Sequence, residues 1–99
     1  MPAYVVVDIE VIDPVRYETY KTLAAAAVKA HGGEYLVRGG KTEVLEGEWS
    51  PRRFVLLRFP TVEKAKGWWA AADYAPAKGI RQAAAHTSMI VVEGTEPPI

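Results

Sequence analysis

Three side chains at and just after the end of the first predicted helix could perform acid–base chemistry together. His31, Tyr35 and Arg38 lie close to one another in the chain. A histidine titrates near neutral pH and can act as a general base, and an arginine can stabilise a developing oxyanion. His31 also has a structural interpretation, because a cation at the C-terminal end of a helix interacts favourably with the helix dipole. The sequence leaves both interpretations open.

Arginines inside predicted strands form a second candidate set. Arg38, Arg53 and Arg58 all lie in or next to segments with a strand pattern. An arginine head that is shielded from water needs a carboxylate or a bound anion. Asp8 and Arg58 are a plausible cross-strand pair if the first and third strands are neighbours. These arginines therefore form structural ion pairs, in part across a dimer, or Arg38 or Arg53 holds a ligand carboxylate or phosphate.

Aromatic side chains suggest contacts for an aromatic ligand. Trp68 and Trp69 are adjacent on a predicted helix, so only one can face the core while the other leans towards a pocket rim or a subunit contact. Packing is the alternative role, since aromatic residues bury large areas in small domains. For Trp49, in a loop, we expect interface anchoring. The predicted site consists of a catalytic base, His31, and the ligand-binding residues Tyr35, Arg38, Arg53, Trp69 and Tyr74.

Several other kinds of site are disfavoured. The chain has no cysteine, and His31 and His86 lack a zinc-binding spacing, so we expect no metal and no cofactor. No Ser-His-Asp order or GxSxG motif indicates a nucleophile. The pairs Gly32-Gly33 and Gly39-Gly40 belong to no phosphate-binding motif, and a helix end and a strand kink explain them.

Bulk properties exclude further classes of function. The twelve basic and twelve acidic residues cancel, which disfavours nucleic acid and membrane surfaces as partners. The N-terminus does not resemble a signal peptide, and the apolar stretch 23–28 is far shorter than the roughly 20 residues of a membrane span. The lack of cysteine suits a reducing compartment, so we expect a cytoplasmic protein.

Hydrophobic periodicity predicts the element order β-α-β-β-α-β. We expect Gly39-Gly40 to kink one long strand, with a hairpin turn as the alternative. Pro76 either begins a short third helix or kinks a continuous one. The predicted strands are Ala3 to Val11, Tyr35 to Arg38 continued by Thr42 to Glu46, Arg53 to Phe59, and His86 to Glu93. The predicted helices run from Asp13-Pro14 to His31, from Thr61 with an apolar stripe of Val62, Ala65, Trp69 and Ala72, and from Ala75 to Ala84.

This order is typical of an α+β ferredoxin-like sandwich, a four-stranded antiparallel sheet with the helices on one face. We predict a single domain over residues 1–94 and a C-terminal tail over 95–99. The other sheet face would be bare and partly apolar. A homodimer through this open face would cover it.

The combined segments HGGEYLVRGG, EVLEGEW, FVLLRFPTVEKA and WW with the following DY resemble the domain-of-unknown-function family DUF1330, in the dimeric α+β barrel superfamily. The resemblance covers Ala3 to Gly94. It implies a ferredoxin-like subunit and a sheet-to-sheet homodimer, and it brings no activity. Relatives in the superfamily include cofactor-free monooxygenases of polycyclic phenols, muconolactone-type isomerases and haem-handling proteins. Ala71-Ala72 replaces a common Ser-Pro pair, which favours an unbroken helix through residue 72.

Two hypotheses follow for the function. In the first, a cytoplasmic homodimer binds a small aromatic or anionic ligand between sheet and helices. It could then act as a cofactor-free monooxygenase or isomerase, with His31 as the base and Arg38 as the oxyanion stabiliser. In the second, the chain is a structural or interaction module whose arginines and tryptophans build the dimer.

Overall fold

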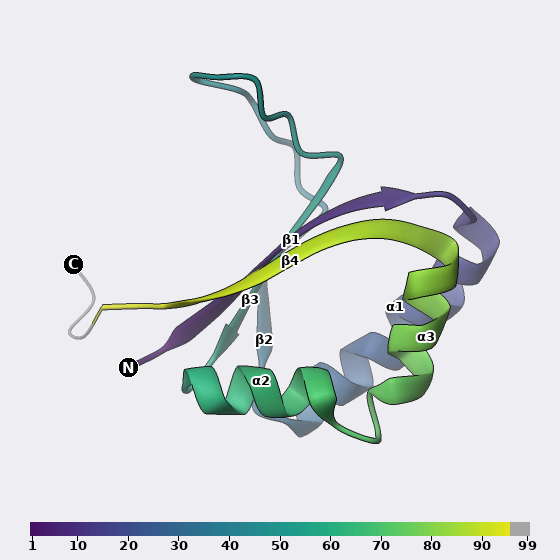
Figure 1. The fold of residues 1–99 in the computed structure, drawn as a ribbon, viewed down its shortest axis with the longest axis vertical. Coiled ribbons are helices and arrows are strands. Elements are labelled where there is room, and N and C mark those ends of the chain that lie inside the picture. The colour runs from purple at the N-terminus through teal and green to yellow at the C-terminus, as the bar shows by residue number, and fades with distance from the viewer. Residues whose placement is uncertain (96–99) are drawn as a thin grey trace.

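The computed structural model describes residues 1–95 as one sheet covered by helices on a single side (Figure 1). The sheet is antiparallel, with the strand order β2-β3-β1-β4. This arrangement confirms the predicted ferredoxin-like fold. The elements are β1 (Ala3–Val11), α1 (Pro14–Ala30), β2 (Glu34–Arg38), β3 (Arg53–Phe59), α2 (Val62–Ala70), α3 (Ala75–Ala84) and β4 (Ala85–Glu93). Residues 96–99 of the predicted tail lie outside the described residues.

Strand β1 lies between β3 and β4 and supplies the centre of the core. Its side chains alternate between the two faces, so Val5, Val7 and Ile9 point towards the helices and are almost fully buried. Val6 points to the other face, opposite Leu56 of β3 and Ile90 of β4.

Helix α1 begins and ends at the predicted residues. The Asp13 carboxylate accepts a hydrogen bond from the backbone N–H of Arg16 (3.2 Å), and Pro14 occupies the first turn, where no N–H is needed. Gly32 follows the helix with φ 79°, a conformation that glycine adopts without strain. The buried face of α1 consists of Tyr17, Tyr20, Ala24, Ala27 and Val28.

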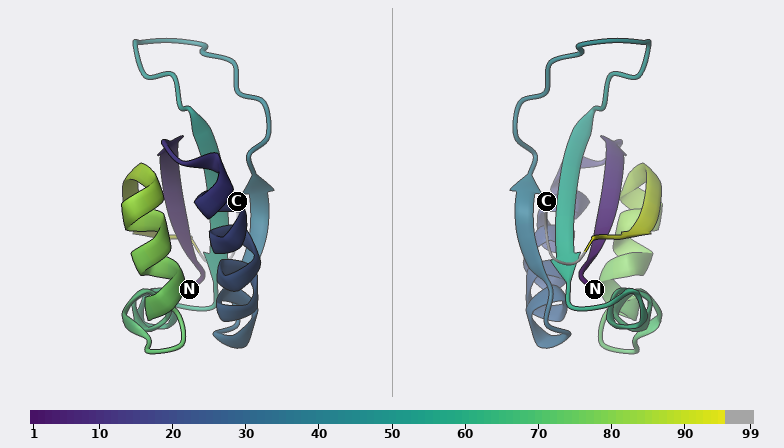
Figure 2. Two further views of the ribbon diagram at one scale, coloured as in Figure 1. Left: turned by 90° about the vertical axis from the view of Figure 1, so that its right-hand side faces the viewer. Right: turned by 90° about the vertical axis from the view of Figure 1, so that its left-hand side faces the viewer.

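The connection between β2 and β3 differs from the prediction. Strand β2 ends at Arg38, where Gly39 turns with φ 77° and donates its N–H to the Phe54 carbonyl (2.8 Å). The predicted strand Thr42 to Glu46 is wrong, because no strand of the described chain pairs with it. The segment projects beyond the sheet and away from the helices (Figures 1 and 2), and its Leu45 is 99% exposed.

The second half of the helical layer contains two separate helices. The prediction of an unbroken helix through residue 72 is wrong, because Ala71 is extended (φ −71°, ψ 147°) and ends α2. The predicted apolar stripe of α2 also needs correction. Ala65 of the stripe is buried, but the buried tryptophan is Trp68, while Trp69 is 45% exposed. The ring centre of Trp68 lies 5.3 Å from that of Phe59 and 4.4 Å from that of Tyr74.

The sheet register excludes one predicted ion pair. Asp8 lies opposite Phe54, and Arg58 lies farther along β3, so the expected Asp8–Arg58 pair is wrong. Arg58 instead pairs with Glu34 of β2, with 3.1 Å between Nη1 and Oε1. The neighbouring strands were predicted correctly, but the register between them was not.

Candidate ligand-binding cavity

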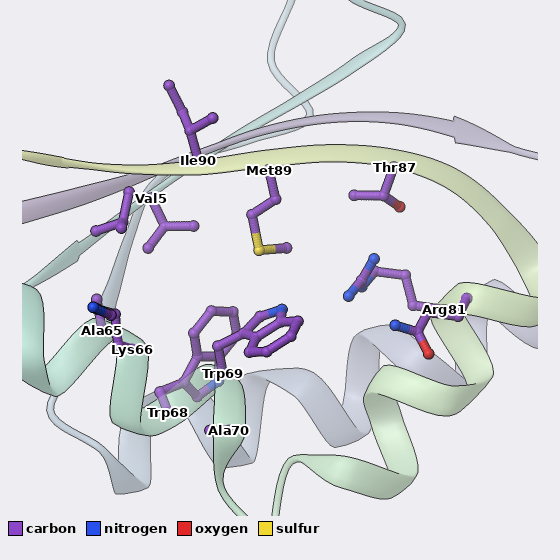
Figure 3. A pocket seen from close by; sticks show the side chains of 12 residues that line it. Val5, Ala65, Lys66, Trp68, Trp69, Ala70, Arg81, Thr87, Met89 and Ile90 are labelled. Atoms are coloured by element: carbon purple, nitrogen blue, oxygen red, sulfur yellow. The ribbon is translucent and has the colours of Figure 1, made fainter.

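A cavity of about 590 Å³ lies between strand β4 and helices α2 and α3 (Figure 3). Its volume is in the range of sites that hold small organic molecules. Most of its wall is apolar, and its polar groups are few. The residues that line it are Val5, Ala65, Lys66, Trp68, Trp69, Ala70, Arg81, Gln82, Thr87, Met89, Ile90 and Val91.

Three elements aim side chains into this cavity. Thr87 and Met89 are two residues apart on β4, so both point from the strand towards the helices. Trp68 reaches it from α2, and Arg81 extends from α3 towards β4 (Figure 3). Residues that lie far apart in the sequence therefore come together at this site, and the sheet and both helices position them.

Three buried polar atoms of the wall have no hydrogen-bond partner in the structure. They are Trp68 Nε1, Arg81 Nε and Thr87 Oγ1. Such atoms are rare in folded proteins, and each costs about 1–3 kcal/mol when it is left unsatisfied. Two of the three are donors only, and the threonine hydroxyl can also donate. Together they suit a ligand atom that accepts hydrogen bonds.

The positive charge of Arg81 lacks a counter-charge within the described chain. Arg81 is 5% exposed, and none of the ion pairs among residues 1–95 includes it. Its neighbour Tyr20 does not neutralise it. Burial, with a smaller contribution from Tyr74, raises the pKa of Tyr20 far above its ordinary value, so its hydroxyl stays neutral. A buried cation in this position favours an anionic partner.

Two predicted site residues lie in the wall of this cavity or against it. Trp69 forms part of the wall, and the Nζ atom of Lys78 lies 3.9 Å from its ring centre. Tyr74 is fully buried behind Trp68 of the wall, with 4.4 Å between the two ring centres, and its hydroxyl oxygen lies 3.0 Å from that of Tyr20.

Three others meet at the opposite edge of the sheet. The register of β2 against β3 shifts between Tyr35 and Val37, which is the geometry of a β-bulge. The extra residue brings Tyr35 and Arg38 to the same face, with the Arg38 guanidinium carbon 4.5 Å from the Tyr35 ring centre. Arg53 joins them, and its Nε donates to the Tyr17 hydroxyl (3.1 Å).

His31 lies apart from both groups, just after the last residue of α1. Its Nε2 is 2.8 Å from Asp73 Oδ1, and the 590 Å³ cavity is lined by other residues. The structure thus distributes the six predicted site residues over three places. The catalytic role of His31 stays a prediction.

Sequence reasoning missed Arg81 and Thr87. A signal for Arg81 exists on α3, where Ala77, Arg81 and Ala84 follow the spacing of a buried face. An arginine in such a stripe indicates that its positive charge is buried inside the protein. Thr87 carries no comparable signal, because threonine is common in strands.

Among residues 1–95, no group of three or more histidine, aspartate or glutamate side chains could hold a metal ion. No helix within the same residues has both the length and the apolar character needed to cross a bilayer.

The sequence matches one family model, the domain of unknown function DUF1330, over residues 2–95. The chain belongs to the DUF1330 family. No protein of curated function matches this DUF1330 chain.

Several solved structures have the same fold as this DUF1330 protein. RPA0582 of Rhodopseudomonas palustris, a protein of unknown function, is 17% identical with a TM-score of 0.77 and covers 97% of this chain and 84% of its own. SnoaB of Streptomyces nogalater, described as a cofactor-independent oxygenase, is 14% identical with a TM-score of 0.64 and covers 97% of each chain. A dimeric ferredoxin-like protein from Jannaschia sp. CCS1 is 12% identical with a TM-score of 0.64 and covers 94% of this chain and 99% of its own. At these identities the similarity establishes the fold.

Proposed function

We propose that this DUF1330 protein binds a small organic anion with an aromatic body in the cavity between β4, α2 and α3. The observation that carries this proposal is the set of three unpartnered buried polar atoms, on Trp68, Arg81 and Thr87, in an otherwise apolar wall. An aromatic body would pack on Trp69 and Met89. Its carboxylate or phenolate oxygen would accept hydrogen bonds from Arg81 and Thr87.

Binding of 2-naphthoate, compared with uncharged 2-naphthamide, tests this proposal. We expect naphthoate to quench tryptophan fluorescence saturably and to bind at least tenfold more tightly than the amide. Arg81→Met should weaken naphthoate binding by about 10- to 100-fold, since a hydrogen bond to a charged group contributes about 1.5–3 kcal/mol. The control is Arg16→Met, which changes an exposed arginine of α1. Equal naphthoate affinity in a folded Arg81→Met protein would contradict the proposal.

Cofactor-independent oxidation of a phenolic ligand is a second candidate function. It is favoured by the position of Arg81, a fixed buried cation that would stabilise a phenolate in the same cavity. SnoaB, which shares the fold, is described as a cofactor-independent oxygenase. The expected result is oxygen uptake with anthrone that Arg81→Met abolishes. The roles predicted for His31 as base and Arg38 as oxyanion stabiliser are tested in the same assay by their alanine variants.

We also propose that the protein works as a cytoplasmic homodimer through the open sheet face. Val6, Leu56, Ile90 and Val92 lie on this face without helices above them, and Ile90 is 63% exposed. A related fold from Jannaschia sp. CCS1 is described as dimeric. In sedimentation velocity we expect a dimer that Ile90→Asp converts to a monomer. The control is Val15→Asp, which changes an exposed residue of α1 on the helical side.

The alternative function, a structural module, makes the opposite predictions. Arg38→Ala or His31→Ala would then dissociate the dimer, and naphthoate would not bind. If these residues serve a ligand, both variants stay dimeric.

A further inference from the structure

A second group of cations lies at the other edge of the sheet, between α1 and the adjoining ends of β2 and β3. From its geometry we infer that Arg38 and Arg53 form a separate binding site for an oxyanion, the phosphate or carboxylate group of a small molecule. This inference does not depend on the ligand proposed for the cavity between β4, α2 and α3.

The first argument is the missing counter-charge. Arg16, Arg52 and Arg58 each pair with a carboxylate. Within residues 1–95, Arg38 and Arg53 have neutral hydrogen-bond partners and no carboxylate within ion-pair distance. Arg38 Nη2 donates to the Lys21 carbonyl (3.2 Å), and Arg53 Nε donates to the Tyr17 hydroxyl (3.1 Å). The other N–H groups of both guanidiniums remain available for an anion.

The second argument is that both guanidiniums are held in place. Arg38 lies over the ring of Tyr35, and the guanidinium carbon of Arg53 lies 5.6 Å from the ring centre of Tyr17. These contacts limit the motion of long side chains, so less entropy is lost when an anion binds.

Gly39 provides space for Arg53. It has φ 77°, and a Cβ atom at this position would collide with Arg53 Nη1. The glycine that ends β2 therefore allows the guanidinium to lie against the backbone. A residue with a side chain would displace it.

The third argument is the shape and charge of the surface. Arg38 and Arg53 border an open hollow of about 590 Å³, together with Glu18, Lys21 and Thr22. Lys21 and Glu18 pair with each other (2.9 Å) and cancel, so the hollow keeps the two positive charges of the arginines. Two guanidinium forks suit the oxygens of a phosphate or carboxylate group.

This hollow is distinct from the cavity between β4, α2 and α3. The two share no lining residue, and the crevice between them, bordered by Arg53 and Met89, holds only about 20 Å³. Such a space accommodates about one water molecule. One ligand therefore cannot occupy both sites in this structure.

Titration with inorganic phosphate and with acetate, at constant ionic strength, tests the inference. The readout is the NMR signal of each arginine Nε–H in the full chain. We expect saturation by phosphate at millimolar concentrations on Arg38 and Arg53, and at least a fivefold loss of affinity in Arg38→Met and in Arg53→Met. Arg58→Met is the matched control, because that arginine is already paired with Glu34.

Two further variants make the outcome specific. Gly39→Ala should weaken phosphate binding by displacing Arg53, and Arg81→Met should leave it unchanged while it weakens naphthoate binding. A response to phosphate alone assigns the site to phosphate, and a response to acetate assigns it to carboxylates as well. Signals that shift without saturation, or equal losses in Arg58→Met, would overturn the inference.

Discussion

The hydroxyl oxygens of Tyr20 on α1 and Tyr74 just before α3 lie 3.0 Å apart inside the helical layer. This hydrogen bond joins α1 to the residue that precedes α3. Tyr74 is fully buried, and its ring packs against Trp68. The pair is also a close neighbour of Arg81, whose charge acts on Tyr20. The bond therefore helps to hold Tyr74 against Trp68, which lines the cavity of the proposed site.

Replacing Tyr74 by phenylalanine should destabilise the protein. The ring packing would persist, but the Tyr20 hydroxyl would be buried without a partner, which costs about 1–3 kcal/mol. Urea denaturation followed by circular dichroism measures the change. Tyr35→Phe is the control, since no hydrogen bond links the Tyr35 hydroxyl to another described residue. A loss of similar size in both variants would speak against the tyrosine pair as the cause.

Arg81→Met should stabilise the ligand-free protein. The substitution removes a buried charge that has no counter-charge and keeps an apolar chain of similar length, so we expect a gain of about 1–3 kcal/mol in the free energy of unfolding. A residue retained for ligand binding at the expense of stability behaves in this way. Thermal unfolding with and without naphthoate gives the test. The wild type should gain stability from naphthoate, and the variant should gain little.

The link between Asp8 and the projecting segment should depend on pH. Asp8 accepts hydrogen bonds from Trp49 Nε1 (2.9 Å) and from the Arg52 N–H (2.9 Å), and these bonds lower the pKa of its carboxyl group below 3.8. The lowered pKa means that the folded contact stabilises the charged form of the Asp8 carboxyl group. The contact is therefore complete above pH 3.8 and is lost as the pH falls through the lower folded value.

The indole N–H signal of Trp49 in NMR follows this titration directly. We expect it to shift with a midpoint below pH 3.8, and Asp8→Ala should remove the transition. The indole signal of Trp69 serves as the reference. A midpoint above 3.8 would contradict the expected direction.

Two glycines provide a matched test of packing. A Cβ atom at Gly33 would lie 2.7 Å from ring atoms of Phe59, while one at Gly67 on α2 would meet nothing within 4 Å. Gly33→Ala should therefore destabilise the protein by about 1–3 kcal/mol through overpacking. Gly67→Ala should stabilise it by about 0.5–1 kcal/mol, because alanine has the higher helix propensity. Denaturant midpoints that move in the same direction would contradict this account.

The sequence by itself determined the elements whose signals are local. Asp13-Pro14 and Gly32 delimit α1, and the alternating apolar residues from Ala3 to Val11 specify β1. These signals depend on backbone geometry and on burial of one face, both of which act over a few residues. The order of such elements was enough to predict the ferredoxin-like fold.

Only the tertiary structure decided which side chains meet. Thr42 to Glu46 has a strand pattern, but a strand needs a neighbour, and the described chain provides none. The bulge after Tyr35 put Arg38 on the same face, and the register separated Asp8 from Arg58. Arg81 came to face Thr87 because α3 packs beneath β4. Register and packing depend on contacts between distant segments, so no local pattern specifies them.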